Sequence, residues 1–132
     1  MKVSVVGSTK KKIEIHVEGS PPWKQSVADK TEKQRQKERA EVLRKKAKEI
    51  YDEPLTLVTD ISLTIKYNRN QGRSDPCNII GGIADTLQEI YYDDRFIKNV
   101  QYSEHSGLKD EYWIIIKATF YDKVLKSEEI NI

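Results

Sequence analysis

Residues 73–94 read RSDPCNIIGGIADTLQEIYYDD, and the rest of the chain is organised around this stretch. At about 100° per residue, a helix over residues 78–90 separates an apolar stripe from a polar one. The apolar stripe consists of Ile80, Ile83, Leu87 and Ile90, with Ile79 beside it. The opposite side carries Asn78, Gly82, Asp85 and Glu89, with Gly81 at its edge. The spacing therefore predicts a short helix that buries one side and exposes the other.

Carboxylates surround this predicted helix. Asp75 and Pro76 precede it, where an Asp can cap free N–H groups and a Pro is tolerated in the first turn. Asp85 lies on its polar side, and Asp93 and Asp94 follow its last apolar residue. Mg²⁺ is held by a few such oxygens while it keeps waters for a phosphate substrate, so the stretch is a candidate metal site. Capping and turn preferences also explain each Asp taken singly.

The same residues resemble the signature of RusA-type Holliday junction resolvases. That signature is Asp-x-Asp-Asn-x-x-Lys-x-x-x-Asp-x-Leu, followed by a short spacer and an Asp-Asp pair. Two positions depart from it, because Cys77 stands where the family has its second Asp and Gly81 where it has its Lys. A thiol is a soft ligand and replaces an Mg²⁺-binding carboxylate poorly. Six positions match: Asp75, Asn78, Asp85, Leu87, Asp93 and Asp94.

The resemblance implies a single RusA-like domain over residues 1–132 that acts as a homodimer on branched DNA. It implies a Mg²⁺-dependent endonuclease in recombination or repair, commonly of prophage origin. Asp75 and Asp94 would hold the metal, with Asp85 or Asp93 replacing the missing carboxylate. One alternative is a catalytically impaired RusA-like protein that binds DNA junctions. Another, from a different class, is a dimeric protein-interaction module.

Three segments alternate apolar and polar residues with the period of a strand. Residues 13–18 place His16 on the polar side, where we interpret it as a solvated residue. Residues 55–67 hold the longest alternation, with a bend or bulge expected near Thr59. Residues 112–121 have apolar side chains on both faces, which predicts a strand that is central or covered on both sides.

A shorter strand over residues 100–104 precedes the last of these. The order strand, helix, strand, helix, strand, strand indicates an α+β domain, with two main helices against a mixed β-sheet.

The first of the two helices is predicted from Thr31 to about Tyr51. Nine Lys or Arg residues stand against three Glu between Lys30 and Lys48. This charge suits a phosphate backbone, but it also suits a solvated helix face with i,i+4 pairs such as Glu41 with Lys45. A buried stripe is expected only in the second half, from Ala40, Leu43, Ala47 and Ile50.

The predicted DNA contacts are basic residues outside the carboxylate stretch or just before it. Arg69 and Arg73 belong to a polar loop that leads to Asp75, where an arginine can bind substrate oxygens. The full set is Lys24, Lys45, Lys48, Arg69 and Arg73.

Composition excludes several other classes of protein. With 132 residues the chain can form one domain with its own core, and a formal net charge of +2 does not by itself indicate nucleic acid. The single cysteine fits a reducing compartment, and two histidines leave no zinc spacing or Ser–His–Asp set to argue. The N-terminus MKVSVVGSTKKK lacks the apolar core of a signal peptide or membrane span. We therefore expect a cytoplasmic protein with no membrane association.

Overall fold

The computed structural model describes residues 8–24, 29–51, 58–72, 74–88, 90 and 94–121. The expected α+β fold, with two helices and a mixed sheet, is confirmed. The elements in chain order are β1 (Ser8–Glu18), α1 (Lys30–Ile50), β2 (Val58–Arg69), α2 (Pro76–Gln88), the 3-10 helix η1 (Asp94–Phe96), β3 (Ile97–Ser106) and β4 (Glu111–Tyr121).

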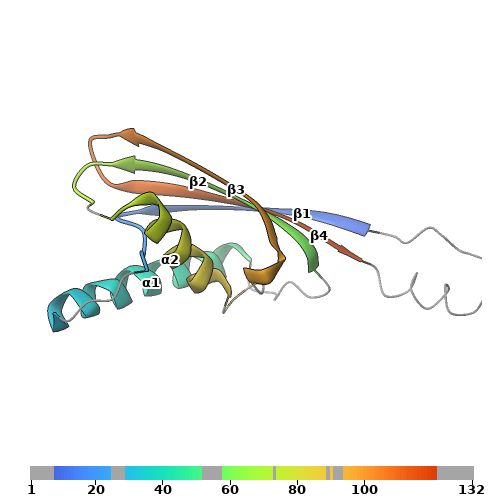
Figure 1. Ribbon diagram of the computed structural model, residues 1–132, viewed down its shortest axis with the longest axis horizontal. Helices are drawn as coiled ribbons and strands as arrows, with labels where there is room; N and C mark the ends of the chain where they lie inside the picture. The colour runs from blue at the N-terminus through green and yellow to red at the C-terminus, as the bar shows by residue number, and fades with distance from the viewer. Residues whose placement is uncertain are drawn as a thin grey trace, which may run out of the picture.

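The sheet has the strand order β1-β4-β2-β3, and both helices lie on the same side of it (Figure 1). β4 runs antiparallel to β1 and to β2, so it is central, as its apolar character on both faces predicts. β2 and β3 are parallel and are joined through α2, which makes a β-α-β crossover. β3 begins at Ile97, earlier than the predicted strand over residues 100–104.

The long predicted strand is confirmed where the structure describes it, and residues 52–57 lie outside the described part. Its pairing with β4 shifts register between Val58 and Asp60, which is the bulge expected near Thr59. Its pairing with β3 shifts between Ile61 and Ser62. Such shifts bend a strand and increase its twist.

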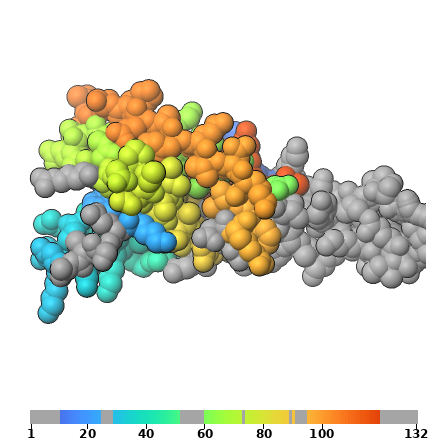
Figure 2. Space-filling view, viewed as in Figure 1, coloured from blue at the N-terminus to red at the C-terminus, as the bar shows by residue number. Residues whose placement is uncertain are grey.

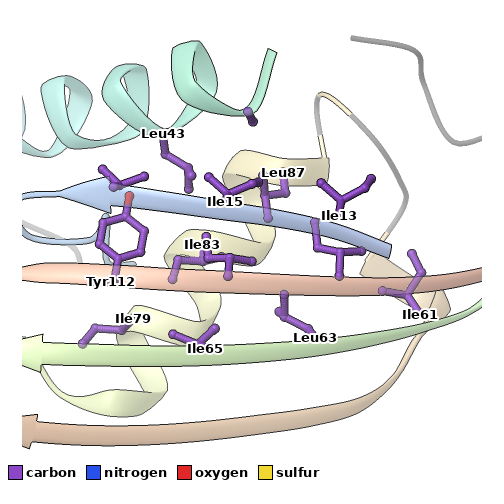
Figure 3. Close-up of a cluster of buried hydrophobic side chains, with 14 of the residues drawn as sticks. Ile13, Ile15, Leu43, Ile61, Leu63, Ile65, Ile79, Ile83, Leu87 and Tyr112 are labelled. Atoms are coloured by element: carbon purple, nitrogen blue, oxygen red, sulfur yellow. The ribbon is translucent and has the colours of Figure 1, made fainter. Parts of the chain in front are cut away.

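The core lies between the sheet and the two helices (Figure 3). Alternate residues of β1, β2 and β4 point toward the helices and are almost fully buried, as strand periodicity predicts. Three apolar residues of α2 and two of α1 close this core from the other side. The labelled members are Ile13, Ile15, Leu43, Ile61, Leu63, Ile65, Ile79, Ile83, Leu87 and Tyr112.

Helix α1 begins at a capping Asp29, whose Oδ1 accepts a hydrogen bond of 2.7 Å from the Thr31 N–H. Of its predicted buried stripe, Leu43 and Ala47 are buried. Ile50 is 43% exposed, so its predicted burial is wrong, because this last residue of the helix lines an open hollow beside β1. The first half has no fully buried side chain and lies at the edge of the molecule (Figure 2, cyan).

Helix α2 packs on two sides. Ile79, Ile83 and Leu87 are buried in the core, and Ile80 is only partly buried. Gly82, predicted on the exposed side, is buried. The correction has a physical cause, because the chain segment at residues 22–24 crosses that side of the helix. A Cβ at position 82 would lie 2.5 Å from the Pro22 carbonyl oxygen.

Candidate nucleic-acid interface

Four chain segments meet where β2 ends. The Lys24 N–H donates to the Asn78 carbonyl at 2.8 Å, and the Gly107 N–H donates to the Arg69 carbonyl at 2.9 Å. The Gly19 N–H donates to the Asp110 carbonyl at 2.7 Å. We call this region, residues 19–24, 69–72, 74–78 and 104–110, the loop end. It brings together the start of α2 and one of the two predicted arginines.

Asp110 orders the loop that follows β2. Its carboxylate accepts the Tyr67 hydroxyl at 2.7 Å and the N–H groups of Asn70, Gln71 and Gly72 at 2.8, 3.1 and 3.2 Å. Burial raises the pKa of Asp110, but these hydrogen bonds outweigh it and hold that pKa below its ordinary value. Three consecutive N–H groups would suit an external anion, but this carboxylate already occupies them.

Arg69, a predicted DNA contact, binds groups within the protein. Its Nε and Nη2 donate to the two carboxylate oxygens of Glu104 at 2.7 and 2.8 Å. Its guanidinium also donates to the carbonyls of Gly72 and Ser74, each at 2.8 Å. The hydrogen bond from Arg69 lowers the pKa of Glu104. With its side chain only 20% exposed, Arg69 holds the loop end together.

Asp75 caps α2, as its position before Pro76 predicts. Its Oδ1 accepts the Asn78 N–H at 2.9 Å, and its Oδ2 accepts the Asn78 side-chain amide at 3.3 Å. Cys77 lies in the first turn and is exposed, so it does not fill a gap in the core. The Asp-x-x-Asn part of the signature is therefore a local, solvent-facing cap.

Lys24 lies across the middle of α2. Its Nζ is 3.4 Å from Asp85 Oδ2, and both side chains are largely exposed. The Lys24 side chain also passes Gly81, where an added Cβ would meet it at 3.4 Å. A lysine from a distant segment thus occupies the space above the position where the RusA signature has its Lys.

Asp75 and Asp94 lie at opposite ends of β2. Asp75 follows Arg69, whereas Asp94 begins η1, just before the residue that pairs with Ile61. At about 3.3 Å per residue, Ile61 and Arg69 are ~26 Å apart along the strand. No group of three or more His, Cys, Asp or Glu that could hold a metal lies within the described residues. One copy of the chain therefore does not bring Asp75 and Asp94 to the same Mg²⁺. The predicted site residues Arg73 and Asp93, and the side chain of Asp94, lie outside the described part of the chain.

Five lysines of α1 form an exposed line, which we call the lysine stripe. At about 100° per residue they fall within ~120° of the helix circumference. They extend over ~27 Å at a rise of about 1.5 Å per residue. None of them forms an ion pair with another residue in the described part of the chain. The stripe consists of Lys30, Lys33, Lys37, Lys45 and Lys48.

The other cations of α1 do have carboxylate partners. Arg35 and Arg39 both pair with Glu32, and Lys46 lies 3.9 Å from Glu49. Glu41 pairs with Arg44 rather than with Lys45, the pair expected from i,i+4 spacing. Lys45 and Lys48 were predicted contacts, whereas the first three lysines of the stripe were missed. Lys30, Lys33 and Lys37 are spaced by three and four residues, and this helical spacing was the signal in the sequence that would have identified them.

No protein-family model matches this chain, and no curated protein matches its sequence. The RusA resemblance therefore rests on the residues between Asp75 and Asp94. No helix within the described residues combines the length and the apolar character needed to cross a membrane.

Proposed function

We propose that this chain is a RusA-like protein that binds branched DNA, with the lysine stripe of α1 on the phosphate backbone. What supports the proposal is the absence of carboxylate partners for these lysines within the described residues. A lysine already paired with a glutamate gains less from a phosphate, since it must give up its partner. An unpaired lysine neutralises a phosphate and releases counterions, which favours binding.

The stripe also has a suitable length. Its ~27 Å corresponds to roughly eight base pairs of stacked duplex at about 3.4 Å each. Lysine contacts to phosphates position a protein on DNA without reading its sequence. A protein that recognises the shape of a junction rather than a base sequence would use contacts of this kind.

Binding is tested with a labelled synthetic four-way junction and a duplex of equal length. Lys45→Glu with Lys48→Glu should weaken both complexes on the order of tenfold or more at low salt. The matched control is Lys46→Glu with Lys109→Glu, which changes the charge equally at lysines that pair with Glu49 and Glu18. Equal loss in the two double variants, or no loss in the first, would favour a protein-interaction module instead.

Mg²⁺-dependent cleavage is a second candidate activity. It is favoured by the exposed Asp75 carboxylate and its bonds to Asn78, which preserve the start of the RusA signature. Because one copy separates Asp75 from Asp94, a shared metal would need two copies, and a two-fold dimer can supply them. The test is incubation of the junction with and without Mg²⁺ or Mn²⁺.

Subunit mixing sharpens this test. Asp75→Asn and Asp94→Asn should each abolish any metal-dependent cleavage, since each removes one ligand. A mixture of the two variants should regain part of the activity if ligands come from different copies, because some mixed dimers carry one intact site. Cleavage in the absence of metal would contradict the shared site. Cleavage by each variant on its own would also contradict it. Binding without any cleavage would leave the junction-binding proposal intact.

A further inference from the structure

We propose that the face of the sheet opposite the helices binds single-stranded nucleic acid, through a ring stack and a separate group of lysines. Both helices pack against the other face (Figure 1), and α1 reaches this one at the edge formed by β1, where Lys46 and Ile50 line a hollow together with His16 and Trp113. We call the face opposite the helices the open face. Its residues alternate with the buried core residues along each strand. Its members include Lys12, His16, Lys66, Trp113, Ile115 and Lys117.

The ring stack joins β1 to β4. His16 and Trp113 are directly opposite in the antiparallel register, and their rings stack with centroids 4.7 Å apart at an angle of 14°. His16 Nε2 lies 2.9 Å from Glu111 Oε1, which fixes the orientation of the imidazole. Its side chain is 42% exposed, so part of the stack faces solvent. Lys66 of β2 lies on the other side of Trp113 in the same row.

A hollow of about 640 Å³ lies beside this stack, and its lining includes His16, Lys66, Trp113, Ile115 and His105 from the sheet and Lys46 and Ile50 from α1. The side chains that line this hollow include aromatic rings and a lysine ammonium group, so the hollow is not purely apolar. Bases stack on such rings regardless of their identity, because every base has a π face, and the nearby ammonium group attracts the phosphate.

The other end of the open face is basic. Lys12 and Lys117 stand directly opposite each other on β1 and β4. Like charges in this position destabilise a sheet, and a bound anion would relieve the repulsion. Lys12 has a 3.4 Å contact with Glu14, whereas Lys117 has no ion pair in the described part of the chain. A second hollow, of about 340 Å³, is lined by both lysines, by Lys11 and Lys98, and by one carboxylate, Asp60.

The two ends are spaced for a nucleic-acid strand. Trp113 and Lys117 point to the same face of β4 and are ~13 Å apart at about 3.3 Å per residue, close to the length of four stacked nucleotides. A duplex is excluded as the occupant of the stack, because its bases are already stacked on one another. A protein partner is disfavoured, because the cores of protein interfaces are depleted in lysine.

This inference goes beyond the proposed function and does not depend on it. The open face uses residues of β1, β2 and β4, whereas the lysine stripe belongs to α1; Lys45 of the stripe shares a hollow with His16, but Lys33 and Lys37 line a different one. Each site can therefore be removed without the other. A protein with both would bind duplex arms with one surface and unpaired nucleotides with another.

The test is fluorescence anisotropy of a labelled oligothymidylate of about 12 nucleotides, within the range of single-strand sites. Trp113→Ala and Lys117→Glu should each weaken binding on the order of tenfold, and Trp113→Phe should recover most of the affinity by restoring a ring. Lys33→Glu with Lys37→Glu should leave oligothymidylate binding within about threefold, since these two stripe lysines line a hollow that includes neither His16 nor Trp113. Melting temperatures confirm that each variant is folded.

Three results would overturn the proposal. The first is no binding of oligothymidylate by the unaltered chain. The second is equal affinity of the folded Trp113→Ala and Lys117→Glu variants and the unaltered chain. The third is a change of oligomeric state in these variants with oligothymidylate affinity unchanged, because the face would then be a protein interface.

Discussion

At Gly82, α2 approaches another backbone closely. An added Cβ would meet the Pro22 carbonyl oxygen and the Trp23 Cα at 2.5 Å each, and neither atom can move without shifting the segment. Gly81 has the same helical conformation, but its nearest neighbours are atoms of the flexible Lys24 side chain at 3.4 Å. A comparison of the two glycines therefore distinguishes the effect of helix propensity on stability from the effect of close packing.

Substitution of each glycine by alanine tests this account. Gly81→Ala should be neutral or should stabilise the protein by up to ~1 kcal/mol, the usual gain in helix propensity. Gly82→Ala gains the same propensity but should lose about 1–3 kcal/mol net, because the added methyl overpacks a backbone contact. Denaturant unfolding measures both, and equal stability of the two variants would contradict the close approach.

Cys77 stands where the RusA signature has its second Asp, so an aspartate substituted there restores that carboxylate. Because Cys77 is exposed in the first turn of α2, Cys77→Asp buries no charge. The new carboxylate should stabilise the fold by roughly 0.3–1 kcal/mol through its place at the helix N-terminus. If the stretch is a degenerate metal site, Mg²⁺ should raise the melting temperature of the variant more than that of the unaltered chain, since a hard oxygen ligand has been added. Identical Mg²⁺ responses would contradict that interpretation.

At the scale of elements, the loop end depends on the β3–β4 turn as much as on β2. Asp110 from the turn binds three N–H groups of the loop after β2, and Glu104 at the end of β3 holds Arg69. These bonds join segments far apart in sequence and place the start of α2 relative to the sheet. The depressed pKa of Asp110 makes part of this stability dependent on pH.

The direction of this pH dependence follows from the difference between the folded and unfolded pKa of Asp110. Since the folded pKa of Asp110 lies below the unfolded value of ~3.9, its contribution is complete above that value and is lost as the pH falls through the folded pKa. Asp110→Asn should therefore cost about 1–2 kcal/mol at neutral pH, typical of lost hydrogen bonds to a charged group. The deficit should shrink below about pH 4. Urea unfolding at both pH values measures it, and a deficit independent of pH would show that the charge contributes nothing.

At the scale of the whole molecule, the periodicity of apolar residues predicted the features that depend on residues close together in the sequence. Alternation located β1, β2 and β4, and helical spacing placed Ile83 and Leu87 in the core, whereas Ile80 and Ile90 of the predicted stripe are only partly buried and Ile79 beside it is fully buried. It failed where a distant segment decides the outcome. Gly82 is buried by residues 22–23, an approach that no helical wheel contains.

The candidate site was less predictable than the fold for the same reason. His16 was interpreted as a solvated residue, but its stacking and pairing partners appear only once β1 pairs with β4. Arg69 was assigned to DNA, but Glu104 meets it only because β3 lies parallel to β2. The separation of Asp75 from Asp94 likewise follows from this parallel pairing, whereas the motif alone suggested one cluster.

Assembly is the next prediction at this scale. We expect a homodimer, because a four-way junction offers two symmetric strands and a two-fold interface reuses one patch on both copies. Strand β3 is at an edge of the sheet and most of its side chains are exposed, so it offers backbone groups for such a contact. Sedimentation at tens of micromolar, an order of magnitude suited to interfaces of standard size, should find the dimer. Monomer alone at that concentration would contradict it.

The salt dependence of junction binding tests the central claim that the lysine stripe binds DNA phosphates. For five phosphate contacts, a plot of the logarithm of the association constant against that of salt concentration should fall with a slope of roughly −4 to −5. Lys45→Glu with Lys48→Glu should make this slope shallower by about 2, because two contacts are lost, and the Lys46→Glu, Lys109→Glu control should leave it unchanged. A slope near zero for the unaltered chain, or the same slope in the stripe variant, would contradict the account.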